Sequence, residues 1–327
     1  MKDPIAKRHF RGVLATTLVA GTLLIAGTQG ASATTISSHA THAKLKSILF
    51  VNPLPKYPQW AIIVSCLSKQ SKALGIPETE TGPVGTLNAT TMVQEIQQGI
   101  ADKVGAIVTF PASPAFIPIL AQARKAGIIT GTMYGGGGSA TGQFNTGTDW
   151  TALGAEFVAP LAARSGTQNV ALLVQAATGV GKAFEDGFVA AAKKTSNVKV
   201  EAVGYTNDDP AAAQQQATDI LTAHPTVNVF ASDMGTATTP VVSVVKAKKL
   251  VGKVVMLANG GSGGGIVGAQ QHVVYRFLLQ NLCGEGDAAA TAAAAIAEGT
   301  KYVKQYNVQT VLAGLSNYKK YLAKGWD

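Results

Sequence analysis

Polar and aromatic side chains recur where the predicted strands of this 327-residue chain end. They are Tyr57, Trp60, Ser113, Tyr134, Asp149, Trp150, Lys182, Asn207, Ser232, Asp233, Asn259 and Gln280. Flat aromatic rings stack on apolar C–H faces, and Asp, Asn, Lys and Gln side chains form hydrogen bonds with hydroxyl groups. Together they suit a small polyhydroxylated ligand, although each residue also has an ordinary interpretation as a helix cap or a packing residue.

Residues 51–60 join the first predicted strand to the first predicted helix. Three prolines fix φ along this connection and remove backbone donors, so it is stiff. It ends with Tyr57 and Trp60. In an open α/β sheet, ligands bind beyond the carboxyl ends of the strands. We therefore predict that this loop forms one wall of a binding site; the alternative is that both rings only cover the start of the helix.

Two glycine-rich segments resemble phosphate-binding loops. Residues 176–183 have the order of a Walker A loop, but Ala176 and Ala183 stand where that motif needs Gly and Ser or Thr. Residues 263–268 have the glycine spacing of a dinucleotide fingerprint. They follow a late strand, and the first acidic residue after them, Glu285, does not stand at the end of a predicted strand as the fingerprint requires. We interpret them as a mobile loop at the lip of a cleft, and no nucleotide cofactor is expected.

Catalytic and metal-binding patterns are weak. Cys66 has no evident histidine partner, and the five histidines show no metal-ligand spacing. Asp208 and Asp209 form an acidic pair, but Pro210 follows them, which is typical of a helix N-terminus capped by aspartate. No set of acid, base and nucleophile emerges. We expect a protein that is not an enzyme and that carries no metal or other cofactor.

The first 33 residues read as an export signal. They combine a basic start, an apolar run over 12–27 and the small residues Ala31, Ser32 and Ala33, and residues 34–43 read as a flexible leader. An uncleaved anchor is the alternative. The formal net charge of +9 comes from scattered basic residues without interleaved aromatics, so no nucleic-acid partner is expected. Export permits disulfides, but spacing does not reveal whether Cys66 and Cys283 pair.

Short β-branched runs alternate with longer helical segments along the chain. The predicted strands are 47–51, 104–110, 128–132, 169–175, 198–205, 227–232, 253–259 and 272–278, and the predicted helices are 60–74, 89–102, 113–126, 152–164, 182–195, 211–223, 236–250 and 288–299. The strands are almost continuously apolar, which indicates parallel sheets buried on both faces. A glycine-rich break at 134–139 suits the passage from one lobe to another. We therefore predict two α/β lobes, with a strand and a short basic helix in the tail.

The order of several motifs resembles the type I periplasmic solute-binding proteins of ABC transporters, including ribose-binding and autoinducer-2- or rhamnose-binding proteins. The segments that carry the resemblance are 59–60, 80–83, 94–100, 105–108, 111–114, 146–149, 204–205, 219–225 and 229–233. They span nearly the whole chain after the leader. The resemblance implies two Rossmann-like lobes with parallel sheets, joined by a hinge of three crossovers.

The resemblance also implies lobe boundaries and a disulfide. The N-terminal lobe would hold residues 44–148 and 280–304, and the C-terminal lobe would hold 149–279 and 305–327. The first and last helices of the N-terminal lobe would then be neighbours, which makes a disulfide between Cys66 and Cys283 plausible.

Carried over by position, Trp60 corresponds to a ring that stacks on the ligand, and Asp149 to a cleft residue at the crossover. Four further positions correspond to polar residues of ribose binders. Lys182 stands where they have Arg, and Asn259 where they have Asp. Ser232 stands near their Asn, and Gln280 within one or two positions of their Gln. The chain departs from that pattern by lacking an Asp-Arg pair after the fourth strand, where Tyr134 stands. The ligand would then be less hydroxylated than ribose, or it would carry a negative charge that Lys56 or Lys182 receives.

The resemblance implies an exported binding protein that delivers a small sugar or sugar-like solute, such as a polyol or an autoinducer-like compound, to a membrane ABC permease. Its place would be the periplasm or the cell surface, and we expect a monomer. A sensory or chemotaxis module that presents the same ligand to a receptor is the main alternative. A nucleotide- or sugar-dependent enzyme is the alternative from another class.

Overall fold

The structure is a computed structural model that describes residues 44–134 and 142–327. The predicted signal peptide, the predicted leader and most of the glycine-rich break at 134–139 lie outside the described residues. Within the described part, two six-stranded sheets are each covered by helices, and the predicted fold class is confirmed. Eight phenylalanines supply most of the largest fully buried side chains of the core.

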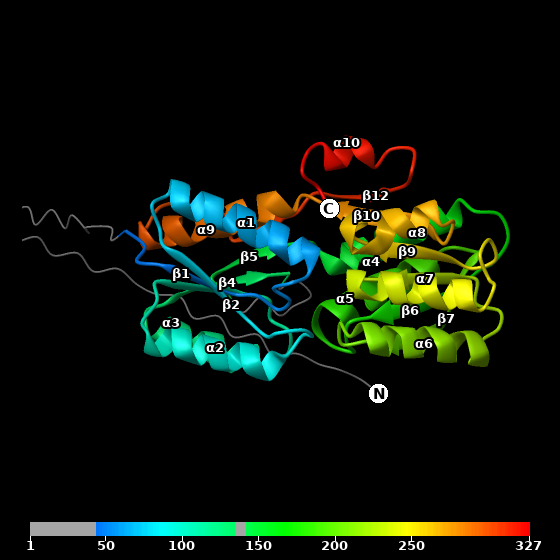
Figure 1. Ribbon diagram of the computed structural model, residues 1–327. Helices are drawn as coiled ribbons and strands as arrows, with labels where there is room; N and C mark the ends of the chain where they lie inside the picture. Colours follow the sequence, from blue (N-terminus) through cyan, green and yellow to red (C-terminus); the bar gives the residue numbers. More distant parts are fainter. Residues whose placement is uncertain (1–43, 135–141) are drawn as a thin grey trace, which may run out of the picture. The chain divides into compact units, whose positions relative to one another are not determined.

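The first sheet has the strand order β11-β5-β4-β3-β1-β2, and every neighbouring pair is parallel. Its strands are β1 (Ile48–Val51), β2 (Glu78–Thr81), β3 (Ala106–Thr109), β4 (Ile129–Met133), β5 (Phe144–Gly147) and β11 (Gln305–Asn307). Its helices are α1 (Pro58–Ala73), α2 (Ala89–Ala101), α3 (Phe116–Lys125) and α9 (Leu282–Ala297). Figure 1 shows α1 and α9 on one face of the sheet and α2 and α3 on the other.

The second sheet has the order β12-β10-β9-β8-β6-β7 and is parallel except for the antiparallel pair β10/β12. Its strands are β6 (Gln168–Val174), β7 (Val198–Tyr205), β8 (Val229–Ser232), β9 (Val255–Asn259), β10 (Val274–Gln280) and β12 (Thr310–Ala313). The accompanying helices are α4 (Trp150–Ala162), α5 (Gly179–Ala192), α6 (Pro210–Ala223), α7 (Thr238–Ala247), α8 (Ile266–Gln270) and α10 (Lys319–Leu322). Helix α4 packs on α5, and α6 packs on α7.

Three strands of the first sheet, β2, β5 and β11, escape prediction because none of them is an apolar run. Strand β2 has the sequence ETET and lies at the sheet edge, where only its pairing with β1 orders it. Strand β5 has the sequence FNTG and is fully buried, but its Asn and Gly disfavour a strand. The Phe144 ring packs so closely on Gly131 that a Cβ there would lie 2.1 Å from a ring carbon. Tertiary packing therefore outweighs local propensity at β5.

The chain passes between the sheets after β5, after β10 and after β11. The third passage follows Asn307 rather than residue 304, because β11 pairs with β5 in the first sheet. Backbone bonds tie the passages together: Val308 donates to the Gly147 carbonyl (3.0 Å), and Asn281 donates to the Gln309 carbonyl (3.0 Å). The three passages therefore lie side by side where the chain crosses between the sheets.

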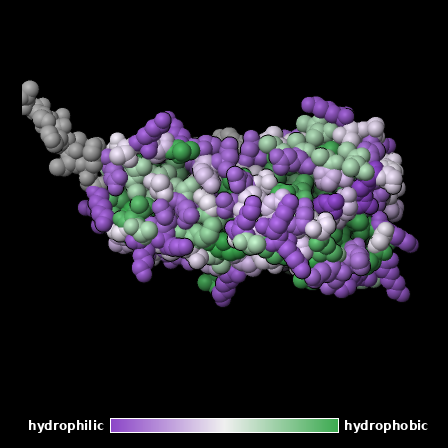
Figure 2. All heavy atoms as spheres, turned by 90° about the horizontal axis from the view of Figure 1, so that it is seen from above, coloured by the Kyte–Doolittle hydropathy of each residue, from purple (hydrophilic) through white to green (hydrophobic). Residues whose placement is uncertain are grey.

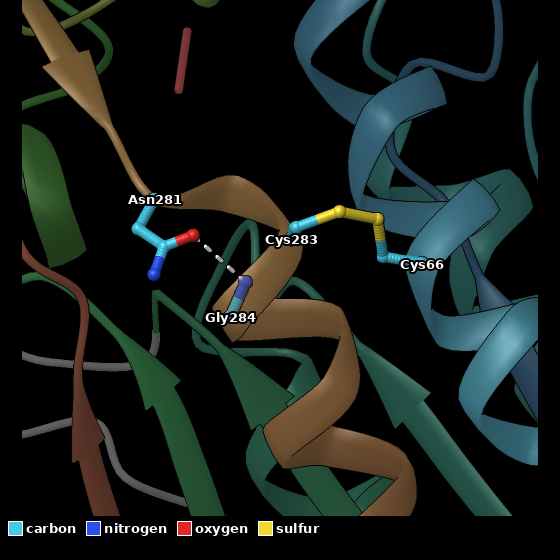
Figure 3. The surroundings of a disulfide bond; sticks show 4 residues. All are labelled: Cys66, Asn281, Cys283 and Gly284. Atoms are coloured by element: carbon cyan, nitrogen blue, oxygen red, sulfur yellow. Dashed lines mark hydrogen bonds between the residues drawn. A yellow bond between two sulfur atoms is a disulfide. The ribbon is translucent and has the colours of Figure 1, made fainter. Parts of the chain in front are cut away.

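A disulfide joins α1 to α9. Cys66 and Cys283 are 217 positions apart in sequence, and their Cα atoms lie 5.2 Å apart (Figure 3). The two helices pack closely because α9 presents Gly286 to the α1 backbone, where a Cβ would lie 2.4 Å from the Ile63 carbonyl oxygen. Asn281 caps the start of α9 by accepting from the Gly284 amide (3.1 Å), also shown in Figure 3. The disulfide thus ties the helix that carries Trp60 to the helix that follows the second crossover.

None of the helices in the described ranges is long and apolar enough to cross a membrane. On the face drawn in Figure 2, hydrophobic residues are interspersed among hydrophilic ones and do not form one continuous band.

We expect the double variant Cys66→Ser/Cys283→Ser to lose about 2–4 kcal/mol of unfolding free energy, since the bond restricts a long loop in the unfolded chain. Urea unfolding of the oxidised protein and of the variant measures this loss. Wild type treated with reductant should unfold at the midpoint of the variant. Equal midpoints for oxidised and variant protein would contradict the expectation.

Candidate functional site

Six of the residues predicted from sequence line one cavity of about 40 Å³. They are Tyr57, Trp60, Tyr134, Trp150, Asn259 and Gln280. Tyr57 and Trp60 follow β1 and Tyr134 follows β4, both in the first sheet, whereas Asn259 and Gln280 end β9 and β10 in the second. The cavity therefore lies between the carboxyl ends of strands from the two sheets, as expected for ligand sites of open α/β folds.

Aromatic rings form a continuous wall from one lobe to the other. The Trp60 and Tyr134 ring centroids lie 5.7 Å apart, and those of Tyr134 and Trp150 lie 5.5 Å apart, both edge to face. Trp60 also packs on Phe50 and Phe110 at 6.1 and 5.9 Å. Trp60 is 8% exposed and Trp150 is 2% exposed. The two interpretations of Trp60 are thus compatible, because the ring belongs to the core of the first lobe and also lines the cavity.

Amide side chains link the two lobes at the floor of the cavity. The Asn259 Oδ1 atom lies within hydrogen-bonding distance of Gln59 Nε2 (3.4 Å) and of Gln280 Nε2 (3.5 Å). Its Nδ2 group donates to the carbonyl of Asp233. Thr148, at the first crossover, donates to Gln280 Oε1 at 2.9 Å. Asn259 and Gln280 are therefore held in one orientation, as a preorganised polar site requires.

The Tyr57 hydroxyl reaches from the first lobe to the second. It lies against the backbone of Gly235 and Gly263, where a Cβ would come within 2.0 and 2.2 Å of the oxygen. The hydroxyl is buried and has no hydrogen-bond partner. Burial raises the pKa of Tyr57 above its usual value, and the charges of Asp208 and Asp327 add to this. The phenol stays neutral and can donate a hydrogen bond to a bound group.

Asp208 also lines the cavity, although its sequence context suggested capping. The cap of α6 is Asp209, which accepts from the Ala211 amide at 2.8 Å. Asp208 adopts a left-handed conformation (φ 56°) and is 4% exposed, and Thr236 donates to its Oδ1 at 3.3 Å. Burial raises its pKa to about 7. The sequence did contain a signal for Asp208. Two adjacent aspartates precede α6, and a helix start needs only one of them as its cap.

Four of the remaining predicted residues sit outside this cavity on or near the surface. Lys56 and Asn207 are exposed. Asp149 is exposed and caps α4 by accepting from the Ala152 amide at 3.0 Å. Lys182 pairs with Asp186 and Glu185 on its own helix. These residues follow strands, as predicted. Asp149, however, caps a helix and Lys182 forms ion pairs on the surface of its own helix, so neither side chain lines the cavity.

The other three predicted residues are structural or line a separate space. Ser113 borders a second small cavity, together with Phe110 and Gln175. Ser232 is buried and forms a local turn with Met234, accepting from its amide at 3.1 Å. Asp233 is buried and accepts from the Gln175 amide at 3.1 Å. Burial raises the pKa of Asp233 well above its usual value, and the nearby Asp208 adds to this.

The last residue, Asp327, supports the cavity from behind, and the sequence contained no signal for it. Its backbone pairs with Gln280 through two hydrogen bonds of 2.8 and 3.0 Å. Its carboxylate accepts from the Ser262 amide (2.6 Å) and from the Ser262 hydroxyl. Ser262 belongs to a glycine-rich helical turn, Gly261–Gly265. Residues 263–268 were expected to form a mobile loop; they belong instead to this turn and to the start of α8, and Gly263 lies against Tyr57.

Glu285 is a fully buried carboxyl group in the first turn of α9. Burial raises its pKa to about 8, and the hydroxyls of Tyr134 and Thr146 lie close enough to lower that pKa in part. Neither carboxylate oxygen, however, accepts a well-formed hydrogen bond. Glu285 is therefore protonated at neutral pH and sits beside Tyr134, a cavity residue.

We expect Glu285→Gln to flatten the pH dependence of stability. Between the ordinary pKa of about 4.5 and the folded value of about 8, the folded protein keeps a proton that the unfolded chain has released. Stability therefore falls as pH rises through this range, by up to roughly 4 kcal/mol. Urea unfolding at pH 5 and pH 8 measures the difference. Glu298→Gln, at the exposed C-cap of the same helix, should retain the wild-type slope; an unchanged slope in Glu285→Gln would contradict the expectation.

Comparison with known proteins places the fold among binding proteins. Residues 48–301 match the family described as periplasmic binding protein domain. GanP, a glucose-galactose binding protein from Geobacillus stearothermophilus, is 20% identical, with a TM-score of 0.80, covering 84% of this chain and 99% of its own. No curated protein matches the chain.

Two further solved structures share the fold. A solute-binding protein from Burkholderia graminis C4D1M in complex with D-arabinose is 19% identical with a TM-score of 0.78, covering 85% of this chain and 98% of its own. One from Actinobacillus succinogenes 130z with bound D-allose is 22% identical with a TM-score of 0.73, covering 84% and 100%.

Proposed function

This chain belongs to the periplasmic binding protein family, and from that premise we propose that it is an exported solute-binding protein of an ABC importer. It binds a small sugar or sugar-like solute, such as a polyol, between its lobes and presents it to a membrane permease. It acts as a monomer in the periplasm or at the cell surface, and it binds its ligand without chemical change.

The observation that most supports this proposal is the composition of the cavity between the strand ends. Aromatic rings from both lobes, Trp60 and Trp150, line it together with the amides of Asn259 and Gln280. Rings and amides in this combination match the apolar C–H faces and the hydroxyls of a sugar. Structural relatives with bound D-arabinose and D-allose agree with this ligand class.

Hinge motion accounts for ligand entry. A cavity of about 40 Å³ is far smaller than the roughly 300–1,000 Å³ of typical ligand pockets. A monosaccharide therefore enters when the lobes separate, which breaks the contacts of Tyr57 and Gln59 with the second lobe. The ligand then stabilises a closed state by contacting both lobes at once. The three crossovers, tied by backbone hydrogen bonds, guide this motion.

A thermal-shift screen of sugars, polyols, ATP and NAD tests the proposal. A ligand at a hundred times its Kd stabilises the folded state by about 2.7 kcal/mol, which is a readily measured rise in Tm. We expect a rise with at least one sugar or polyol. A response to ATP or NAD alone would overturn the proposal in favour of a nucleotide-dependent enzyme.

We expect Asn259→Ala to weaken binding of the ligand found in the screen by about tenfold, since it removes a buried hydrogen-bonding group from the cavity. Titration calorimetry measures the Kd, and the Tm without ligand reports folding. Gln214→Ala, an exposed change on α6, serves as the control and should leave the Kd unchanged. Equal Kd values for wild type and Asn259→Ala would remove Asn259 from the site.

A further inference from the structure

The ionisable side chains around the cavity are acidic. Among the described residues that line it, Asp208 is the only one with an ionisable carboxyl group, and none is lysine, arginine or histidine. Two more carboxyl groups stand close behind. Asp233 lies near enough to Asp208 for the two charges to interact, and Asp327 acts on Tyr57 across the cavity wall. A ligand in this cavity therefore meets carboxyl groups and no basic group among the described lining residues.

The basic residues that the sequence assigned to a charged ligand do not line this cavity. The Lys182 side chain is engaged by Asp186 and Glu185, and Lys56 is exposed outside the cavity lining. An anionic ligand would therefore enter an acidic cavity without a lining cation. This argues against the negative charge that the sequence comparison allowed for the ligand.

Asp208 itself is poorly satisfied for a buried carboxyl group. The hydrogen bond from Thr236 is long, at 3.3 Å, and a carboxylate has room for several donors. Residues Asn207 and Asp208 both hold positive φ, at 48° and 56°, which non-glycine residues adopt only at a cost. The backbone is thus held in an unfavourable conformation that places this carboxyl group at the cavity.

Aromatic groups complete the surroundings of Asp208. Tyr57, Trp60, Tyr134 and Trp150 all line the same cavity. Electron-rich ring faces attract cations, and the attraction strengthens when water is excluded. The Tyr57 hydroxyl and the Trp150 indole nitrogen are both buried without partners. The cavity lining thus combines aromatic rings with two buried donors that have no hydrogen-bond partner.

We propose that the cavity selects a sugar or polyol that carries a protonated amino group, which pairs with Asp208, over the corresponding neutral compound. This inference rests on the proposed function, because it names the chemical class of the same ligand. A neutral hydroxyl would also donate to Asp208, but an ammonium group forms a charge-assisted bond that is roughly twice as strong. The preference should amount to at least about tenfold in Kd.

The protonation of Asp208 gives the preference a pH dependence. The groups that face this carboxyl are the Thr236 hydroxyl, the Tyr57 phenol and the carboxyl of Asp233. Burial raises its pKa to about 7, so its charge develops as pH rises through neutrality. Affinity for an amine that stays protonated should therefore increase between pH 6 and pH 8, whereas affinity for a neutral polyol should change less.

Matched pairs of ligands test the proposal by titration calorimetry. The pairs are D-glucosamine with D-glucose at pH 7, and the amino polyol D-glucamine with D-sorbitol at pH 6 and pH 8. We expect the amino member of at least one pair to bind about tenfold or more tightly. Equal or tighter binding of the neutral member in every pair would overturn the inference and leave the proposed function intact. If no carbohydrate of either kind binds here or in the thermal-shift screen, the proposed function fails as well.

A variant separates charge from shape. Asp208→Asn keeps the size of the side chain, and asparagine tolerates the left-handed backbone at this position. We expect it to reduce the preference for the amino ligand to about twofold or less, with a smaller change in the Kd of the neutral ligand. Asp219→Asn removes an exposed carboxylate from α6 and should retain the wild-type preference. An Asp208→Asn protein with a wild-type Tm and an unchanged preference would overturn the proposal.

Discussion

The arrangement of the site depends on a small hydrogen-bonded node around Gln280, at the end of β10. Its backbone pairs with Asp327, and its side chain accepts from Thr148 and lies beside Asn259. Thr148 belongs to the first crossover and Gln280 to the second, so this node fixes the place where the two lobes meet. Because these groups are buried, each would be costly to leave without a partner, and this holds the junction in one geometry.

Around that node, buried carboxyl groups oppose folding. Asp208, Asp233 and Glu285 are each buried, and burial raises the pKa of all three. Keeping such groups out of water destabilises the folded state at neutral pH. The disulfide between Cys66 and Cys283 acts in the opposite direction, and it joins the two helices on which Trp60 and Glu285 lie. The disulfide thus stabilises a part of the fold in which buried carboxyl groups are electrostatically unfavourable.

Most of the fold was predictable because its signals are local. The apolar runs that became β1, β3, β4, β6 and β8 are long enough to indicate buried parallel strands, and the helices between them end within a few residues of the predicted limits. Strands β2 and β5 could not be predicted in this way. The first is polar and lies at an edge, and the second contains Asn and Gly, so only pairing with a neighbour orders them. The same holds for β11, which moved the third crossover beyond residue 304.

For the site, the sequence by itself determined which side chains follow strands. Because the strands are parallel, their carboxyl ends, and the side chains that follow them, lie at the same edge of a sheet. That was sufficient to bring Tyr57, Trp60, Tyr134, Trp150, Asn259 and Gln280 together. Only the tertiary structure decided where each side chain is used. Asp149 caps α4, Lys182 pairs along α5, and Asp208 rather than Asp209 lines the cavity. The physical reason is that capping, ion pairing and a left-handed backbone conformation redirect a side chain over a few ångströms, a distance that position along the chain does not encode.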